Sequence, residues 1–253
     1  FFFANGVKLT ADASWSRAKR DELNLENNTQ LMPSPQLDSV TLAFASNGFS
    51  QLHPGRDYSD ASKLFLANTI YGSGYGKVPK VADELKSFRL DAEFPMSGAM
   101  QNAFTSIHVG ANYADRSKQK WQPEGNINLG AQGNTPVGSE FQYGLVDLGF
   151  AGVGYIPSWN VPGAVAKYMT FNPTDDTAAY LIPKAWTVNE KISTGFVQAN
   201  IDTVWGSVPV RGNIGVQIQH TDQSSDSRVW DNSQPAGHEI RPYSNGKTYT
   251  DVL

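Results

Sequence analysis

The feature that most constrains this chain is a two-residue alternation of apolar and polar side chains. Successive side chains of a β-strand point to opposite faces, so this alternation predicts strands with one apolar and one polar face. The alternating segments are 8–16, 86–94, 105–113, 193–203 and 210–221. A sixth strand is predicted to begin near Lys247. The chain is therefore expected to be all-β.

The connections between the predicted strands alternate between short and long. Segments 95–98 and 205–209 are short and carry Gly or Pro, as tight turns do. The connections after the first, third and fifth strands are long. Long connections are uncommon in compact domains and are usually functional. Short turns at one end and long loops at the other are typical of outer-membrane barrels, where the short turns are periplasmic and the long loops extracellular.

Two observations exclude other classes of protein. The chain has no cysteine, which excludes disulfides and thiolate metal sites, and its net charge of -4 argues against nucleic-acid binding. No apolar stretch is long enough for a membrane-spanning helix, but barrel strands leave a weaker signal. We therefore expect an antiparallel transmembrane β-barrel segment. A soluble antiparallel sandwich remains the alternative, although its regular turn spacing is interrupted here.

The alternation within each strand, referred to below as its parity, predicts which side chains face lipid and which face the interior. A cation on the lipid face costs ~2–4 kcal/mol at mid-membrane. A one-residue slip of segment 86–94 would turn Arg89, Asp91 and Glu93 toward lipid together. We expect these three residues to face a polar lumen instead. The aromatics expected near strand ends on the lipid side are Trp15, Phe94, Tyr113 and Trp205.

The sequence contains no recognisable catalytic or metal-binding motif. The stretch 72–77 lacks the first glycine of a phosphate loop, and Val78 follows its lysine. The four histidines are not at metal-ligand spacing, and there is no Gly-x-Ser-x-Gly elbow. Asp91 and Glu93 share a face, but Arg89 beside them suits charge balance. We expect no enzyme activity, no metal and no cofactor.

Aromatic residues in or beside the long connections are the candidate ligand contacts. They are Tyr71, Tyr75, Trp121, Tyr155, Trp159, Trp186 and Trp230. Aromatic faces with neighbouring Asn, Gln and Asp suit a sugar, whose C–H faces stack while its hydroxyls form hydrogen bonds. The simpler alternative is that these rings pack the connections together. Arg89, Asp91 and Glu93 are added as polar groups of the lumen.

Seven runs of residues, spread over the chain in order, resemble a known family. They are RAKRDELNLEN (17–27), NTIYGSGYGKVP (68–79), DELKSFRLDAE (83–93), ANYADRSKQKWQPEG (111–125), KAWTVNEKISTGFVQANID (184–202), PVRGNIGVQIQHTDQSS (209–225) and GKTYTDVL (246–253). They look like the barrel region of TonB-dependent receptors of the Caulobacter- and Xanthomonas-type branch. The resemblance implies a 22-stranded barrel around an N-terminal plug, with uptake powered through TonB.

The chain departs from that family in what it lacks. Compared with that family, we expect residues 1–253 to lack the signal peptide, TonB box, plug domain and closing C-terminal strand. We expect 1–253 to be a partial barrel domain, with about six strands, of a Gram-negative outer-membrane transporter. The expected partners are the TonB system through the plug, outer-membrane lipid and a small nutrient, for which an oligosaccharide is favoured and siderophore or peptide uptake remains open. The rival is a soluble β-rich carbohydrate-binding or cell-surface module.

Overall fold

The computed structural model describes residues 1–32, 37–46, 48–69 and 72–253. The chain divides into two compact units, which are described separately. Unit 1 consists of Phe1–Asp21, Lys80–Trp121 and Ala179–Leu253, and unit 2 consists of Glu22–Pro79 and Gln122–Ala178. The described elements are antiparallel strands apart from one α-helix and short 3-10 turns, so the all-β prediction is confirmed. Within the described ranges, no helix is long and apolar enough to cross a membrane.

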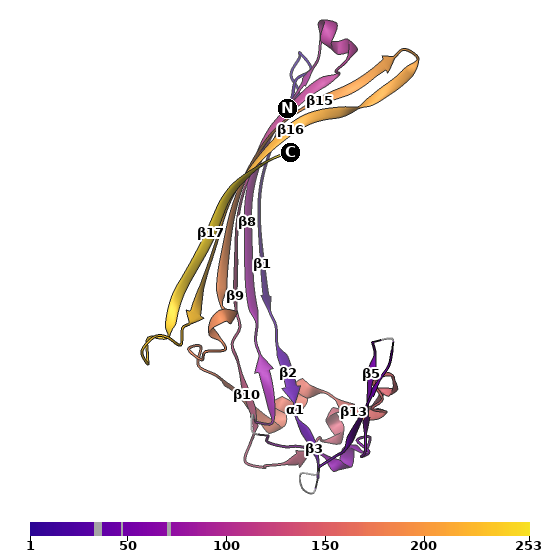
Figure 1. Cartoon of the computed structure of the whole chain (residues 1–253), viewed down its shortest axis with the longest axis vertical. Coiled ribbons are helices and arrows are strands. Elements are labelled where there is room, and N and C mark those ends of the chain that lie inside the picture. The colour runs from indigo at the N-terminus through magenta and orange to yellow at the C-terminus, as the bar shows by residue number, and fades with distance from the viewer. Residues whose placement is uncertain (33–36, 47, 70–71) are drawn as a thin grey trace. The chain divides into compact units, whose positions relative to one another are not determined.

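Among the described residues of unit 1, six strands form one antiparallel sheet (Figure 1). In spatial order they are β1 (Lys8–Asp21), β8 (Lys80–Pro95), β9 (Ser106–Trp121), β15 (Trp186–Trp205), β16 (Val208–Trp230) and β17 (Ile240–Val252). The six predicted strands are confirmed, and each is longer than predicted. The apolar alternation stops before the strand does, because backbone pairing continues where both faces are polar. The pairing of Asp21 with Lys80 is one example.

The register gathers most of the apolar side chains of the alternating segments on one face of the sheet, called here the apolar face. Its members are Leu9, Ala11, Ala13, Trp15, Phe88, Leu90, Ala92, Phe94, Ile107, Val109, Ala111, Tyr113, Val197, Ala199, Ile201, Val210, Ile214, Val216, Ile218 and Val252. Phe88 is 51% exposed, Val216 50% and Ile214 65%. The described part of the chain therefore leaves these side chains open to the surroundings.

The apolar face has a sharp boundary along the strands. The cross-strand row at its edge consists of Trp15, Lys86, Asp115, Lys191, Asp222 and Thr248. From that row onward the same face is predominantly polar, and the strands continue. Trp15 and Tyr113 consequently lie at the edge of the apolar band but in mid-strand. The expectation that they mark strand ends was wrong, whereas Trp205 does end β15.

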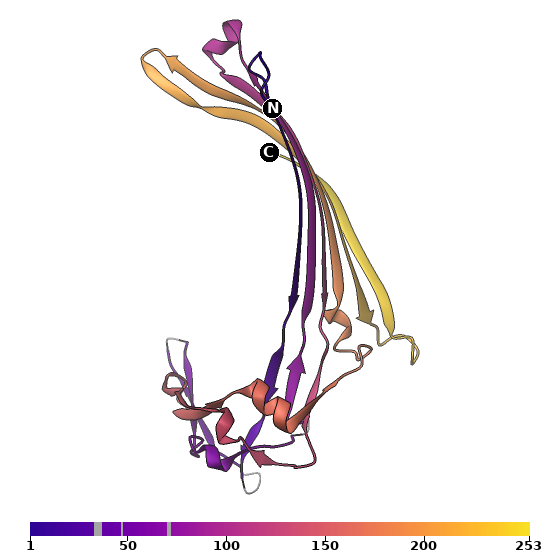
Figure 2. The ribbon, with the colours of Figure 1, turned by 180° about the vertical axis from the view of Figure 1, so that it is seen from behind.

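The short connections differ in length. Between β15 and β16 the turn is Gly206-Ser207, and Gly206 has φ +68°, a conformation that favours glycine. Figure 2 shows this hairpin from behind. The β8–β9 connection is longer than predicted and holds a 3-10 turn, η2 (Gly98–Asn102). The connection after β16 is only 231–239, not the predicted long loop, because β17 starts at Ile240.

Unit 2 is built from the two long connections, which fold into further strands instead of irregular loops. Its described strands are β2 (Asn24–Asn27), β3 (Thr29–Leu31), β4 (Val40–Phe44), β5 (Ser50–Pro54), β6 (Leu64–Leu66), β7 (Gly74–Lys77), β10 (Glu124–Leu129), β11 (Thr135–Pro136), β12 (Gln142–Asp147), β13 (Tyr155–Trp159) and β14 (Met169–Pro173). They pair in the orders β14-β10-β7-β2, β11-β6-β3, β12-β13 and β4-β5. The expectation of loops was wrong because these strands are too short to show alternation.

Helix α1 (Val161–Tyr168) and a small core complete unit 2. Asn160 caps the helix, since its Oδ1 accepts a hydrogen bond from Gly163 N at 3.0 Å, and Pro162 occupies the first turn. The buried core side chains are Leu66, Ile127, Val137 and Met169. The 3-10 turns of this unit are η1 (Ala61–Lys63), η3 (Ser139–Phe141) and η4 (Gly149–Ala151), and η5 (Ile182–Lys184) belongs to unit 1.

Asp231 organises the connection between β16 and β17. Its Oδ1 accepts hydrogen bonds from Ser233 N at 3.0 Å and Ser233 Oγ at 2.6 Å, and its Oδ2 accepts one from Gln234 Nε2 at 2.9 Å. These hydrogen bonds, those from Ser233 above all, lower the pKa of Asp231 from 3.8 to about 2. The carboxylate form thus fixes this turn.

A lowered pKa means that the folded state binds the proton less tightly than the unfolded state. The contribution of Asp231 to stability is therefore present above pH 3.8 and lost as the pH falls toward 2. We predict that the carboxyl carbon of Asp231 titrates near pH 2 by NMR, and that Ser233→Ala raises this pKa toward 3.8. Asn232→Ala, which removes a neighbour bonded to Trp230 instead, leaves the pKa unchanged. Titration near 3.8 in the unmodified protein would contradict this account.

Candidate functional site

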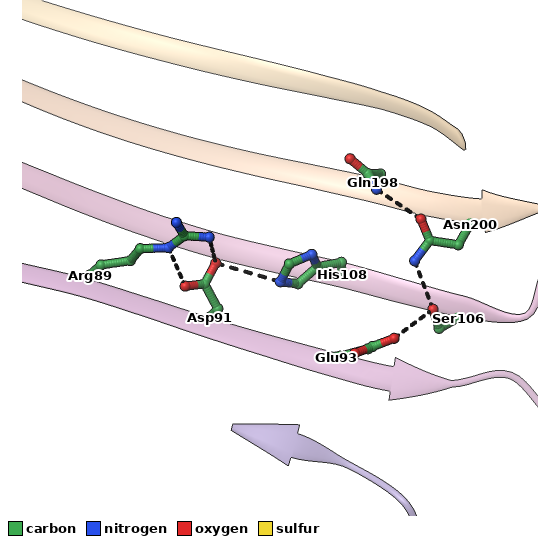
Figure 3. Close-up of polar contacts among 7 residues, drawn as sticks. All are labelled: Arg89, Asp91, Glu93, Ser106, His108, Gln198 and Asn200. Atoms are coloured by element: carbon green, nitrogen blue, oxygen red, sulfur yellow. Dashed lines mark hydrogen bonds and ion pairs between the residues drawn. The ribbon is translucent and has the colours of Figure 1, made fainter. Parts of the chain in front are cut away.

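The polar face of the sheet, opposite the apolar face, carries a cluster of charged residues on β8 and β9 (Figure 3). Arg89 Nη2 donates a hydrogen bond to Asp91 Oδ1 at 3.0 Å, and Arg89 Nε donates a second one to Asp91 Oδ2. His108 Nε2 lies 3.5 Å from Asp91 Oδ1. Asp91 is only 6% exposed. A buried carboxylate is costly unless it is paired, and the guanidinium offsets that cost.

A second chain of hydrogen bonds links β8, β9 and β15 on the same face. Ser106 Oγ donates to Glu93 Oε1 at 3.1 Å, and Asn200 Nδ2 donates to Ser106 Oγ at 2.9 Å. Gln198 Nε2 in turn donates to Asn200 Oδ1 at 2.8 Å. Figure 3 shows these side chains in sequence along the face. Each member has a hydrogen-bond partner, so the network holds its side chains in fixed positions.

Gly110 makes room for the cluster. It pairs with Asp91 on one side and with Phe196 on the other. A Cβ at Gly110 would lie 2.5 Å from the Phe196 ring and 2.6 Å from Asp91 Oδ1. The Phe196 ring also packs edge-on against His108, with ring centroids 5.1 Å apart. Neither Gly110 nor Phe196 is among the predicted site residues, although the two-residue alternation places Phe196 as an apolar residue on the polar face.

An open pocket of about 370 Å³ lies over this cluster. Its lining residues are Lys8, Thr10, Asp12, Arg89, Asp91, Glu93 and His108. This volume is within the usual range of small-molecule sites. Cations and anions are interspersed in the lining, which suits a polar ligand with several donors and acceptors. The Ser106 hydroxyl is hydrogen-bonded to the Glu93 carboxylate and the Asn200 amide, and no hydrogen bond joins it to His108 among the described contacts. This arrangement suits the binding of a polar ligand.

The three charged residues predicted as a site, Arg89, Asp91 and Glu93, are brought together by the structure. Across the described ranges, no three His, Asp or Glu side chains are placed to hold a metal ion. Tyr71 lies outside the described residues.

The predicted aromatic contacts are dispersed within each unit. Trp121 and Trp186 lie at the same end of neighbouring strands but on opposite faces, and Trp230 lies on β16. In unit 2, Tyr75 belongs to β7, whereas Trp159 ends β13 and packs against the core. Neither unit therefore gathers its described rings into a single aromatic platform.

No protein-family model, no curated protein and no solved structure matches this chain.

Gly110→Ala tests the packing of the cluster. The added methyl group must displace Phe196 and Asp91, and overpacking of this kind costs ~1–3 kcal/mol. We predict a lower free energy of unfolding and a change in the NMR shifts of the His108 ring, which the edge of Phe196 now influences. Gly195→Ala is the matched control, because a Cβ there meets nothing within 4 Å. Equal effects of the two substitutions would contradict the prediction.

Proposed function

We propose that the sheet of unit 1 is part of the wall of an outer-membrane β-barrel, and that the chain belongs to a TonB-dependent transporter that imports a nutrient into a Gram-negative bacterium. The observation that carries this proposal is the exposed apolar band, which lies opposite a polar face across all six strands. Each large apolar side chain left in water forfeits ~1.5–3 kcal/mol of burial free energy. Lipid around the wall removes that cost.

The dimensions of the band fit a bilayer. On β9 it extends from Ile107 to Tyr113, which at ~3.3 Å per residue corresponds to ~20 Å before side chains are added. The lipid-facing band of such barrels is ~25 Å tall. Strand β9 has 16 residues, more than the ~9–11 needed to cross. Its polar part beyond Asp115 would then project past the membrane on the extracellular side.

The polar face would line the wet interior of the barrel. In that arrangement Arg89 and Glu93 face the water and the imported molecule, whereas Asp91, which is only 6% exposed, fixes the position of Arg89. Interspersed charges and fixed amides offer donors and acceptors to a hydroxyl-rich compound, which favours a carbohydrate-derived nutrient. Coupling to the TonB system would occur through a plug domain, as the family resemblance implies.

The rival is a soluble β-rich carbohydrate-binding or cell-surface module. It explains the polar pocket equally well. However, it requires a further protein layer over the apolar face, on which Phe88 is 51%, Val216 50% and Ile214 65% exposed in the described chain. The two proposals therefore differ in what touches that face.

Residues 1–253 contain no cysteine, so single cysteines can report the environment of each face once any cysteine elsewhere in the full-length protein is replaced by serine. Val216 and Gln217 are consecutive residues of β16 that point to opposite faces. We predict that a spin label at Val216→Cys, in the full-length protein in lipid vesicles, collides mainly with oxygen. A label at Gln217→Cys should collide mainly with a water-soluble nickel chelate. Equal accessibility, or label immobilisation at Val216→Cys by protein contacts, would favour the soluble module.

Uptake assays test the transport role. A strain that lacks the full-length protein should lose uptake of at least one compound from a panel of oligosaccharides, siderophores and peptides. When the Arg89→Gln variant is expressed in this strain, the apparent affinity of uptake for the transported compound should be about tenfold weaker, since a charged hydrogen bond to Asp91 is lost. Arg211→Gln removes an exposed ion pair with Asp202 and should restore uptake fully. Normal uptake of every compound by the deletion strain would reject the proposal.

A further inference from the structure

Unit 2 contains a pocket of about 370 Å³ between two β-hairpins. Strands β4 and β5 contribute Val40, Leu52 and Pro54 to one wall. Strand β13 contributes Ile156, Pro157 and Trp159 to the other. The wall residues come from both segments that build unit 2, so the pocket exists only when these segments are folded together.

A close backbone approach fixes the spacing of the two hairpins. Gly152 follows the η4 turn with φ +81°, and a Cβ there would lie 2.8 Å from the carbonyl oxygen of Leu52. Asp147 Oδ1 accepts a hydrogen bond from Gly149 N at 2.7 Å and holds the start of this turn. The pocket is thus set by backbone contact and not only by side chains that could collapse into it.

The lining is apolar with one polar corner. Tyr58 Oη donates a hydrogen bond to Asp38 Oδ2 at 3.0 Å, and both residues line the pocket. Burial, followed by the hydrogen bond to Asp38, raises the pKa of Tyr58, so its phenol stays protonated at neutral pH. The carboxylate of Asp38 disfavours an anionic ligand. A bare sugar would leave most of its hydroxyls without partners against the apolar walls, which is unfavourable.

We propose that this pocket binds a neutral aromatic ring, either as a free compound or as part of a larger molecule. Trp159, Pro157 and the aliphatic side chains of Val40, Leu52 and Ile156 supply the apolar contacts that such a ring requires. Trp159 remains a ligand contact, as the sequence predicts, but its partner is an aromatic group and not a sugar face. The binding is a property of unit 2 and does not depend on transport through the sheet.

Two glucosides distinguish the ring from the sugar. p-Nitrophenyl β-D-glucopyranoside and methyl β-D-glucopyranoside share the sugar, and only the first has an aromatic ring. With the full chain, we expect the first to bind by calorimetry and the second not to bind. In saturation-transfer NMR, saturation should reach the aromatic protons more than the sugar protons. Equal binding of both glucosides, or saturation centred on the sugar, would overturn the proposal.

A matched pair of variants locates the binding. Leu52, 46% exposed, lines the pocket, whereas Leu145 on β12 is 55% exposed and is not among the lining residues. Leu52→Asn should lower the affinity for the nitrophenyl glucoside about tenfold, and Leu145→Asn should leave this affinity unchanged. Ile156→Asn tests the opposite wall with the same expected loss. Equal affinity of Leu52→Asn, Ile156→Asn and Leu145→Asn would place the binding elsewhere and reject the site.

Discussion

The unbroken antiparallel register of the six-stranded sheet is the constraint on which the rest of unit 1 depends. Strands β15 and β16, for example, pair continuously from Trp186 with Ser227 to Trp205 with Val208. A shift of one residue in any pairing would transfer a whole strand's apolar side chains to the opposite face. The same backbone hydrogen bonds that hold Val197 beside Val216 therefore also hold Phe196 beside Gly110. The apolar face and the polar cluster therefore both depend on the same strand register.

The polar cluster depends on a missing side chain as much as on those present. Asp91 has a guanidinium partner two residues away on its own strand, and His108 approaches it from the next strand. Both carboxylate and aromatic ring need the space above Gly110. The combination explains how a charged group can be nearly buried on a sheet face that is otherwise open. A fixed carboxylate of this kind is better suited to positioning a polar ligand than to proton transfer.

Sequence alternation predicted the strands of unit 1 because one face is apolar, as segment 86–94 illustrates. It could not predict their ends, since Lys80–Leu85 lacks a continuous apolar face and is held by pairing alone. Unit 2 could not be predicted, because its core residues Leu66, Ile127 and Met169 are far apart in sequence and lie on short strands. Parity identified Arg89, Asp91 and Glu93. The role of Gly110 follows only from which residues are its neighbours across the sheet.

The discontinuous origin of unit 2 has a consequence for assembly. Leu66 comes from the connection that follows β1, whereas Ile127, Val137 and Met169 come from the one that follows β9. Neither connection contains the whole core, so unit 2 forms only when the two connections pack against each other. Closing such long-range contacts is slow. The core of unit 2 can therefore form only after both long connections have been brought together.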